Sequence, residues 1–103
     1  MDAKVIEELK AAHGSGLHLI EHDGVEVVAK RPGGPQYRRW KQLTLDEKRR
    51  IDAGATLVRD CVVHPAAAEL QALIDERPGL VDTFAGKLVE LAGASQEATV
   101  TPL

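Results

Sequence analysis

Four histidines and a single cysteine are the side chains of this sequence best suited to holding a metal ion. His18 and His22 lie four residues apart in a β-rich run, so both would share the strand face that carries Ile20. The stretch Cys61–His64 holds a second pair. A structural zinc site needs four ligands, and neither pair comes with the remaining two. We therefore predict no metal site, with these histidines exposed or half-buried.

Cys61 and His64 also have the residue types of a nucleophile and its base. Such a pair requires an accessible thiolate with a lowered pKa. Cys61 instead lies in a run of valines, where a cysteine is usually a small buried hydrophobic residue. Gly33-Gly34 lacks the surrounding residues of a phosphate-binding loop. The sequence thus predicts no catalytic residue and no cofactor, and the protein is not expected to be an enzyme.

The charge of the chain is unevenly distributed. Residues 31–50 carry seven basic against two acidic residues, whereas residues 1–30 carry six acidic against three basic and residues 51–103 carry eight acidic against three basic. Within the basic stretch, the two cations Arg38 and Arg39 lie between the aromatic residues Tyr37 and Trp40. This combination of cations and aromatic residues is the strongest indication of a binding function in the sequence.

Three interpretations of Tyr37–Trp40 are open. The rings could stack on bases while the cations contact phosphates, but a net charge of -3 and a pI of about 5.8 disfavour nucleic acid. The i, i+3 spacing of Tyr37 and Trp40 could instead place both rings on a buried helix face. Tyrosine, tryptophan and arginine are also the types enriched in protein-interface hot spots. We therefore name Tyr37, Arg38, Arg39 and Trp40 as candidate partner-binding residues.

The elements that must position these residues follow from periodicity and turn signals. Residues 3–13 have helical spacing, and Gly14 suits a helix C-terminus. Two β-rich runs, 17–22 and 25–30, are joined by Asp23-Gly24, a strong hairpin signal because both turn positions need positive φ. Residues 31–35 break regular structure, and Pro35 suits the first turn of the helix that carries Tyr37–Trp40.

Three further helices are expected. Thr44 and Glu47 form a capping-box pattern that predicts a helix start, and this helix must end before Pro65. Pro65–Glu76 predicts the next helix, and the last one ends at Gly93. We expect the core to combine apolar residues of these three segments: Ile51, Ala55, Val58, Val62, Leu70, Leu73, Ile74, Leu80, Phe84 and Leu88.

The predicted fold class is α+β, mostly α, with one β-hairpin packed on about four or five short helices. Residues 1–93 would form a single domain and residues 94–103 a flexible tail. The longest apolar runs are too short to cross a bilayer of about 30 Å, and the N-terminus lacks the pattern of a signal peptide. A cytoplasmic protein is expected.

The order of these features resembles the small tail assembly chaperones of long-tailed bacteriophages and prophages. The resemblance covers about residues 25–93 and is most distinctive at Cys61–Pro65 and at Arg77–Leu80. It implies a helical fold that coats the tape measure protein and keeps it soluble while tail tube subunits polymerise around it. The tape measure protein is thus the implied partner, and the tail tube protein and further copies of the chain are additional contacts to consider.

Two alternatives remain open at this point. One is another phage morphogenesis factor, such as a head–tail connector or a minor tail protein that stays in the virion. The other is a small nucleic-acid-binding regulator that uses the basic stretch; salt-sensitive DNA binding would be its mark. Neither a membrane nor a cofactor is an expected partner.

Overall fold

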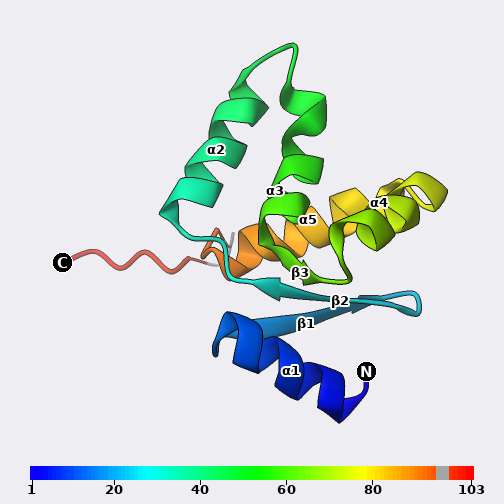
Figure 1. Ribbon diagram of the computed structural model, residues 1–103. Coiled ribbons are helices and arrows are strands. Elements are labelled where there is room, and N and C mark those ends of the chain that lie inside the picture. Colours follow the sequence, from blue (N-terminus) through cyan, green and yellow to red (C-terminus); the bar gives the residue numbers. More distant parts are fainter. Residues whose placement is uncertain (95–97) are drawn as a thin grey trace.

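The computed structural model describes residues 1–94 and 98–103 and shows an α+β fold that is mostly helical (Figure 1). A small antiparallel sheet is covered by α1 on one face and by α5 on the other. The elements are, in order, α1 (Ala3–His13), β1 (Leu17–His22), β2 (Val25–Lys30), α2 (Gly34–Leu45), the 3-10 turn η1 (Arg50–Asp52), α3 (Ala53–Cys61), β3 (Val62–His64), α4 (Ala67–Glu76) and α5 (Gly79–Leu91).

The N-terminal helix and the hairpin confirm the sequence predictions. Asp2 caps α1 by accepting a hydrogen bond from the Lys4 amide at 3.0 Å, and Gly14 ends the helix with φ at 84°. In the hairpin turn, Asp23 and Gly24 have φ values of 52° and 82°. A two-residue turn with positive φ at both positions matches the twist of the strands that it joins, so the turn sets the register of β1 against β2.

A third strand was not predicted. We expected the helix containing Val58 to continue to Val62, but α3 ends at Cys61 and Val62 is extended, with φ at -75° and ψ at 124°. β3 then pairs antiparallel with β2, giving the strand order β1-β2-β3. The reason is that two β-branched valines ahead of Pro65 favour extended backbone, and β2 offers a free edge that satisfies it.

The predicted capping box at Thr44 and Glu47 is wrong. Thr44 lies inside α2, where its hydroxyl donates to the Lys41 carbonyl at 2.6 Å. A threonine hydroxyl can bond back into its own helix, which competes with capping. The chain turns at Asp46 instead, whose carboxylate accepts from the Lys48 amide at 2.9 Å. Helix α3 consequently starts about eight residues later than the pattern suggested.

This shift changes which residues of α3 are buried. Ile51 was expected in the core but precedes α3 and is 87% exposed, and Ala55 is only half-buried. The inward face of α3 carries Ala53, Leu57, Val58 and Cys61. The remaining predictions fare better: Val58, Leu70, Ile74, Leu80, Phe84 and Leu88 are buried, and Val62 and Leu73 pack against them from partly buried positions.

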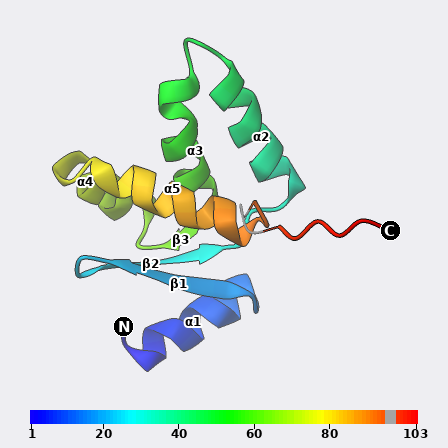
Figure 2. The ribbon, with the colours of Figure 1, turned by 180° about the vertical axis from the view of Figure 1, so that it is seen from behind.

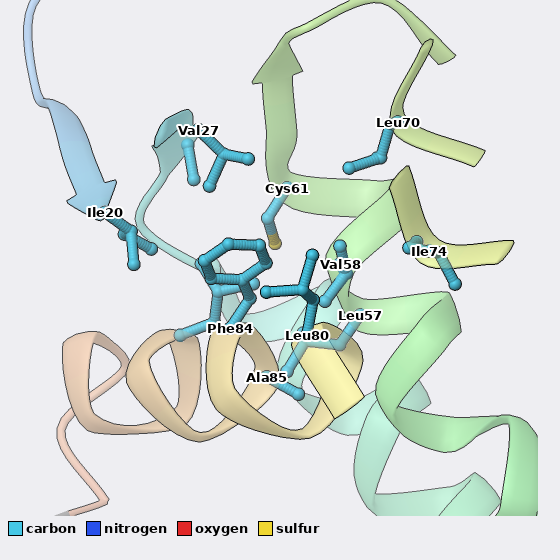
Figure 3. Packing of buried hydrophobic residues seen from close by; sticks show 12 residues of the cluster. Ile20, Val27, Leu57, Val58, Cys61, Leu70, Ile74, Leu80, Phe84 and Ala85 are labelled. Carbon is cyan, nitrogen blue, oxygen red and sulfur yellow. The ribbon is translucent and has the colours of Figure 1, made fainter. Parts of the chain in front are cut away.

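The core lies between α5, α3 and the inner face of the sheet. Phe84 is 1% exposed and sits among residues of several elements, including Val27 of β2 and Cys61 of α3 (Figure 3). α5 supplies the largest share of it, with Leu80, Phe84, Ala85 and Leu88 buried. Arg77, just before α5, reaches back to the hairpin turn and pairs with the Asp23 carboxylate at 2.5 Å. This exposed ion pair links the hairpin turn to the start of α5.

The last part of the chain follows the predicted pattern. Helix α5 ends at Leu91, and Gly93 has φ at 98°. The prediction of a flexible tail from 94 to 103 falls partly on residues 95–97, which lie outside the described residues. Ala98–Leu103 are exposed and have no regular secondary structure; whether they are flexible stays a prediction. Within the described residues, no helix is both long and apolar enough to cross a membrane.

Candidate functional site: a groove between α2, α3 and α5

Three helices border a shallow, open groove of about 350 Å³ that is lined in part by one of the candidate residues, Trp40. Figure 2 shows α5 crossing in front of the base of the α2–α3 pair, and the groove lies where these three helices meet. Its lining comes from all three helices and from η1: Trp40, Thr44, Arg50, Ala53, Gly54, Asp82, Ala85, Gly86 and Val89.

Trp40 forms the aromatic wall of the groove. It is half-buried and packs against the main core cluster. Tyr37, one turn earlier, is also half-buried, and the two ring centroids are 5.4 Å apart with the planes inclined at 46°. A tilted pair at this distance is a favourable aromatic arrangement. The i, i+3 spacing did place both rings on one helix face, and one of them reaches the groove.

The cations of α2 are held outside the groove. The Arg39 guanidinium pairs with the Asp60 carboxylate of α3 at 3.6 Å, and the Arg38 guanidinium folds back over Gly34 at the start of its own helix. The Lys41 ammonium lies 6.0 Å from the Trp40 ring centroid, within the range of a cation–π contact. Of the four candidate residues, Trp40 alone lines the groove. The basic residue in the groove lining is Arg50, which was not a candidate.

The floor of the groove contains two glycines that differ in their surroundings. A Cβ at Gly54 of α3 would lie 3.2 Å from Val81 Cγ1 and 3.5 Å from Ala85 Cβ, so glycine lets α3 approach α5 closely. A Cβ at Gly86 of α5 would meet nothing within 4 Å. A glycine inside a helix costs about 1 kcal/mol relative to alanine. The fold does not require Gly86, which is exposed and lines the groove without a side chain.

The sequence analysis did not identify Gly54 and Gly86 as residues of a groove. An isolated glycine within a helical pattern is a recognisable signal, and both Gly54 and Gly86 carried it. The pattern could not show that they would face the same groove, because that depends on how α3 crosses α5.

The residues considered for chemistry lie elsewhere. Cys61 is buried, and desolvation together with the neighbouring Asp60 carboxylate raises its pKa from 9.0 to about 11. A thiol in this environment is protonated at neutral pH, which is the opposite of an activated nucleophile. His18 and His22 share a face of β1 with Ile20 and border a separate groove against α5. The described residues contain no group of three or more potential metal ligands.

The chain belongs to the DUF6848 family, described as a domain of unknown function, whose sequence profile matches residues 9–101. No curated protein matches it. The chain is similar to a solved structure, that of the uncharacterised protein rbstp2171 from Bacillus stearothermophilus. The two are 26% identical with a TM-score of 0.76, and the match covers 93% of this chain and 99% of the other. The likeness establishes a shared fold that extends over nearly all of both chains.

Proposed function

We propose that this protein is a tail assembly chaperone of a long-tailed bacteriophage, which binds helical segments of the tape measure protein in the α2–α3–α5 groove and acts in the host cytoplasm. The observation that carries the proposal is Gly86. It weakens its own helix, fills no packing need, and lines the groove at an exposed position without a side chain.

The chemistry of the groove suits a helix as ligand. An aromatic wall at Trp40 and a half-buried Val89 offer apolar contact, while a floor of glycine and alanine allows a backbone to approach closely. Arg50 and Asp82 lie among the lining residues and supply one charge of each sign, which can orient a partner helix. Amphipathic helices bind such grooves through apolar residues at helical spacing.

A groove of this size gives one weak contact. A tape measure protein presents many helical turns along one chain, so several copies bound side by side would gain strength from multivalency. Each copy can then be released as tail tube subunits take its place. Weak single contacts are therefore an advantage for a chaperone of this kind.

The test is co-expression of the cognate tape measure protein with and without this chain, measuring the soluble fraction. Gly86→Leu fills the groove without touching the core, because open space surrounds the Cβ position. Gly79→Leu is the matched control: the same substitution in the same helix, also in open space, but outside the groove. We expect wild type and Gly79→Leu to keep the tape measure protein soluble, and Gly86→Leu to lose this activity.

Each outcome has a distinct meaning. A tape measure protein that stays insoluble with wild type contradicts the function. A wild type that works alongside an equally active, folded Gly86→Leu variant contradicts the groove. Binding should also weaken only mildly from 50 to 200 mM salt, whereas a nucleic-acid complex with several phosphate contacts would lose about 10³-fold or more. Arg39→Glu should have little effect, since Arg39 lies outside the groove.

A further inference from the structure

Exposed large apolar side chains occur at two places on the helices and strands of the described structure. Leu45, the last residue of α2, is 78% exposed, and Ile51 of η1 is 87% exposed. Leu19 of β1 is 53% exposed. The other exposed large apolar residues among those described lie outside these elements: Met1, Val100 and Leu103. The folded part of the chain thus presents two uncovered apolar surfaces.

The first surface is the tip of the α2–α3 pair, residues 45–51. The two helices extend away from the sheet, and the turn between them lies at the far end of the pair in both views (Figures 1 and 2). The Arg50 amide donates to the Asp46 carbonyl at 2.9 Å, which closes the turn, so that Leu45 and Ile51 lie at the same tip. Three consecutive exposed bases, Lys48–Arg50, lie between them.

The second surface is the groove between β1 and α5. β1 is an edge strand, since its one strand neighbour among the described residues is β2. The β1–α5 groove has a volume of about 460 Å³, and its apolar lining residues are Leu19, Ile20 and Leu91. Its polar lining residues are His18, Glu21, His22, Thr83, Lys87 and Glu90.

The groove contains one carboxylate that is free to meet an incoming cation. Glu90 pairs with the Lys87 ammonium at 3.1 Å. The exposed Glu21 carboxylate forms no ion pair within residues 1–94 and 98–103. β1 lies toward the opposite end of the molecule from the tip in both views. A tip therefore cannot reach the β1–α5 groove of its own molecule.

The charge of the chain favours contact between unlike ends of two copies. Residues 34–61, from the start of α2 to the end of α3, carry seven basic and four acidic residues. The rest of the chain carries six basic and twelve acidic residues. Like parts of two copies repel each other, whereas the α2–α3 pair of one copy is attracted to the remainder of another. The distribution disfavours contact between two tips and between two β1 edges.

We propose that copies of this protein associate head to tail, with Leu45 and Ile51 of one copy seated in the β1–α5 groove of the next and Lys48–Arg50 facing its Glu21. The two contacting surfaces are different, so the interface is heterologous and each added copy leaves one tip and one groove free. Assembly can then continue beyond a dimer. This inference does not rest on the α2–α3–α5 groove or on its proposed ligand.

Sedimentation velocity of the full chain over a range of concentrations measures the association. We expect the average mass of the wild type to rise with concentration beyond that of a dimer. Ile51→Asp should lower the association constant at least about tenfold, because it places a charge in the apolar contact. Leu19→Lys should do the same by repelling Lys48–Arg50 of the neighbour. Val100→Asp is the control, since Val100 is 90% exposed and outside both surfaces, and it should associate like the wild type.

A mixture of the two defective variants tests the head-to-tail geometry. Ile51→Asp keeps an intact groove and Leu19→Lys keeps an intact tip. Each variant alone should stay monomeric, whereas an equimolar mixture should form a dimer that cannot extend. Both residues are exposed, so both variants are expected to fold, and unchanged far-UV circular dichroism checks this.

Four results would overturn the proposal. One is a wild type that stays monomeric at every soluble concentration. Another is self-association of Leu19→Lys alone, which would indicate contact between two tips. Self-association of Ile51→Asp alone would indicate pairing of two β1 edges. The fourth is a mixture of the two folded variants that stays monomeric, because one intact tip and one intact groove would then fail to bind each other.

Discussion

The two faces of α5 differ in how closely other residues pack against them. On its inner face Leu80, Phe84 and Leu88 are buried to within a few per cent, and large side chains fill the space against α3 and the sheet. On its outer face the helix presents Gly86 and Asp82 to the groove beside Trp40, and the space around Gly86 is empty. One helix therefore combines a packed surface with an unfilled one.

The contrast separates residues that the fold needs from residues that it tolerates. Removing atoms from the inner face leaves a cavity, because the surrounding structure can relax only in part. A Cβ atom added at Gly86 on the outer face would meet no atom within 4 Å. A residue that is suboptimal for stability and unconstrained by packing is the kind expected at a binding surface. The following predictions test this difference between the inner and outer faces of α5.

The largest effect is expected on the packed face. Phe84→Ala should lower the free energy of unfolding by about 3–5 kcal/mol, because the ring is 1% exposed and its loss leaves a cavity at the centre of the core. Chemical denaturation monitored by circular dichroism measures this. A decrease in the free energy of unfolding of less than about 1 kcal/mol would contradict the burial of Phe84 and the close packing of the inner face of α5.

The second prediction uses the thiol that packs on this face. The pKa of Cys61 rises from 9.0 to about 11 on folding. Between these two values the unfolded chain releases the thiol proton while the folded chain keeps it, so stability should fall as the pH rises through this window. Cys61→Ala removes the titrating group. Denaturation midpoints at pH 8 and at pH 10.5 should therefore differ more in wild type than in Cys61→Ala; equal differences would contradict burial of the thiol.

The two groove glycines give a matched pair of smaller effects. Gly86→Ala should stabilise the protein by about 1 kcal/mol, since alanine is the better helix former and its Cβ has open space. Gly54→Ala introduces the same propensity gain but crowds Val81 Cγ1 at 3.2 Å. We expect it to be less stable than Gly86→Ala by about 1 kcal/mol or more. Equal stabilities in thermal unfolding would mean that the α3–α5 contact is not tight.

The last prediction is that zinc does not change the thermal stability of the protein. His18 and His22 border the separate groove between β1 and α5, and the described residues contain no group of three or more potential metal ligands. Thermal unfolding curves recorded with a chelator and with stoichiometric zinc should superimpose. A clear rise in the melting temperature with zinc would show a metal site in the groove between β1 and α5 and contradict this prediction.

Local signals predicted much of the architecture. The span of α1, the hairpin at Asp23-Gly24 and the helix beginning near Pro35 depend on caps, turn conformations and proline geometry, which act between neighbours in the sequence. The buried positions of α4 and α5 followed from helical spacing for the same reason. Thr44 shows the limit of such signals: a capping pattern competes with the continuation of α2, and the pattern alone does not say which one has the lower free energy.

Tertiary structure decided the features that join distant segments. Val62–His64 becomes a strand because β2 offers an edge on which to pair, although α3 could have continued as a helix by spacing alone. Trp40 becomes a wall of the groove because α3 packs closely on α5 at Gly54 and α2 packs beside α3. Residue types and periodicity determine which faces are apolar, but the order and angle in which those faces meet depend on contacts between residues far apart in the chain. The groove and the open edge of β1 exist only at that level.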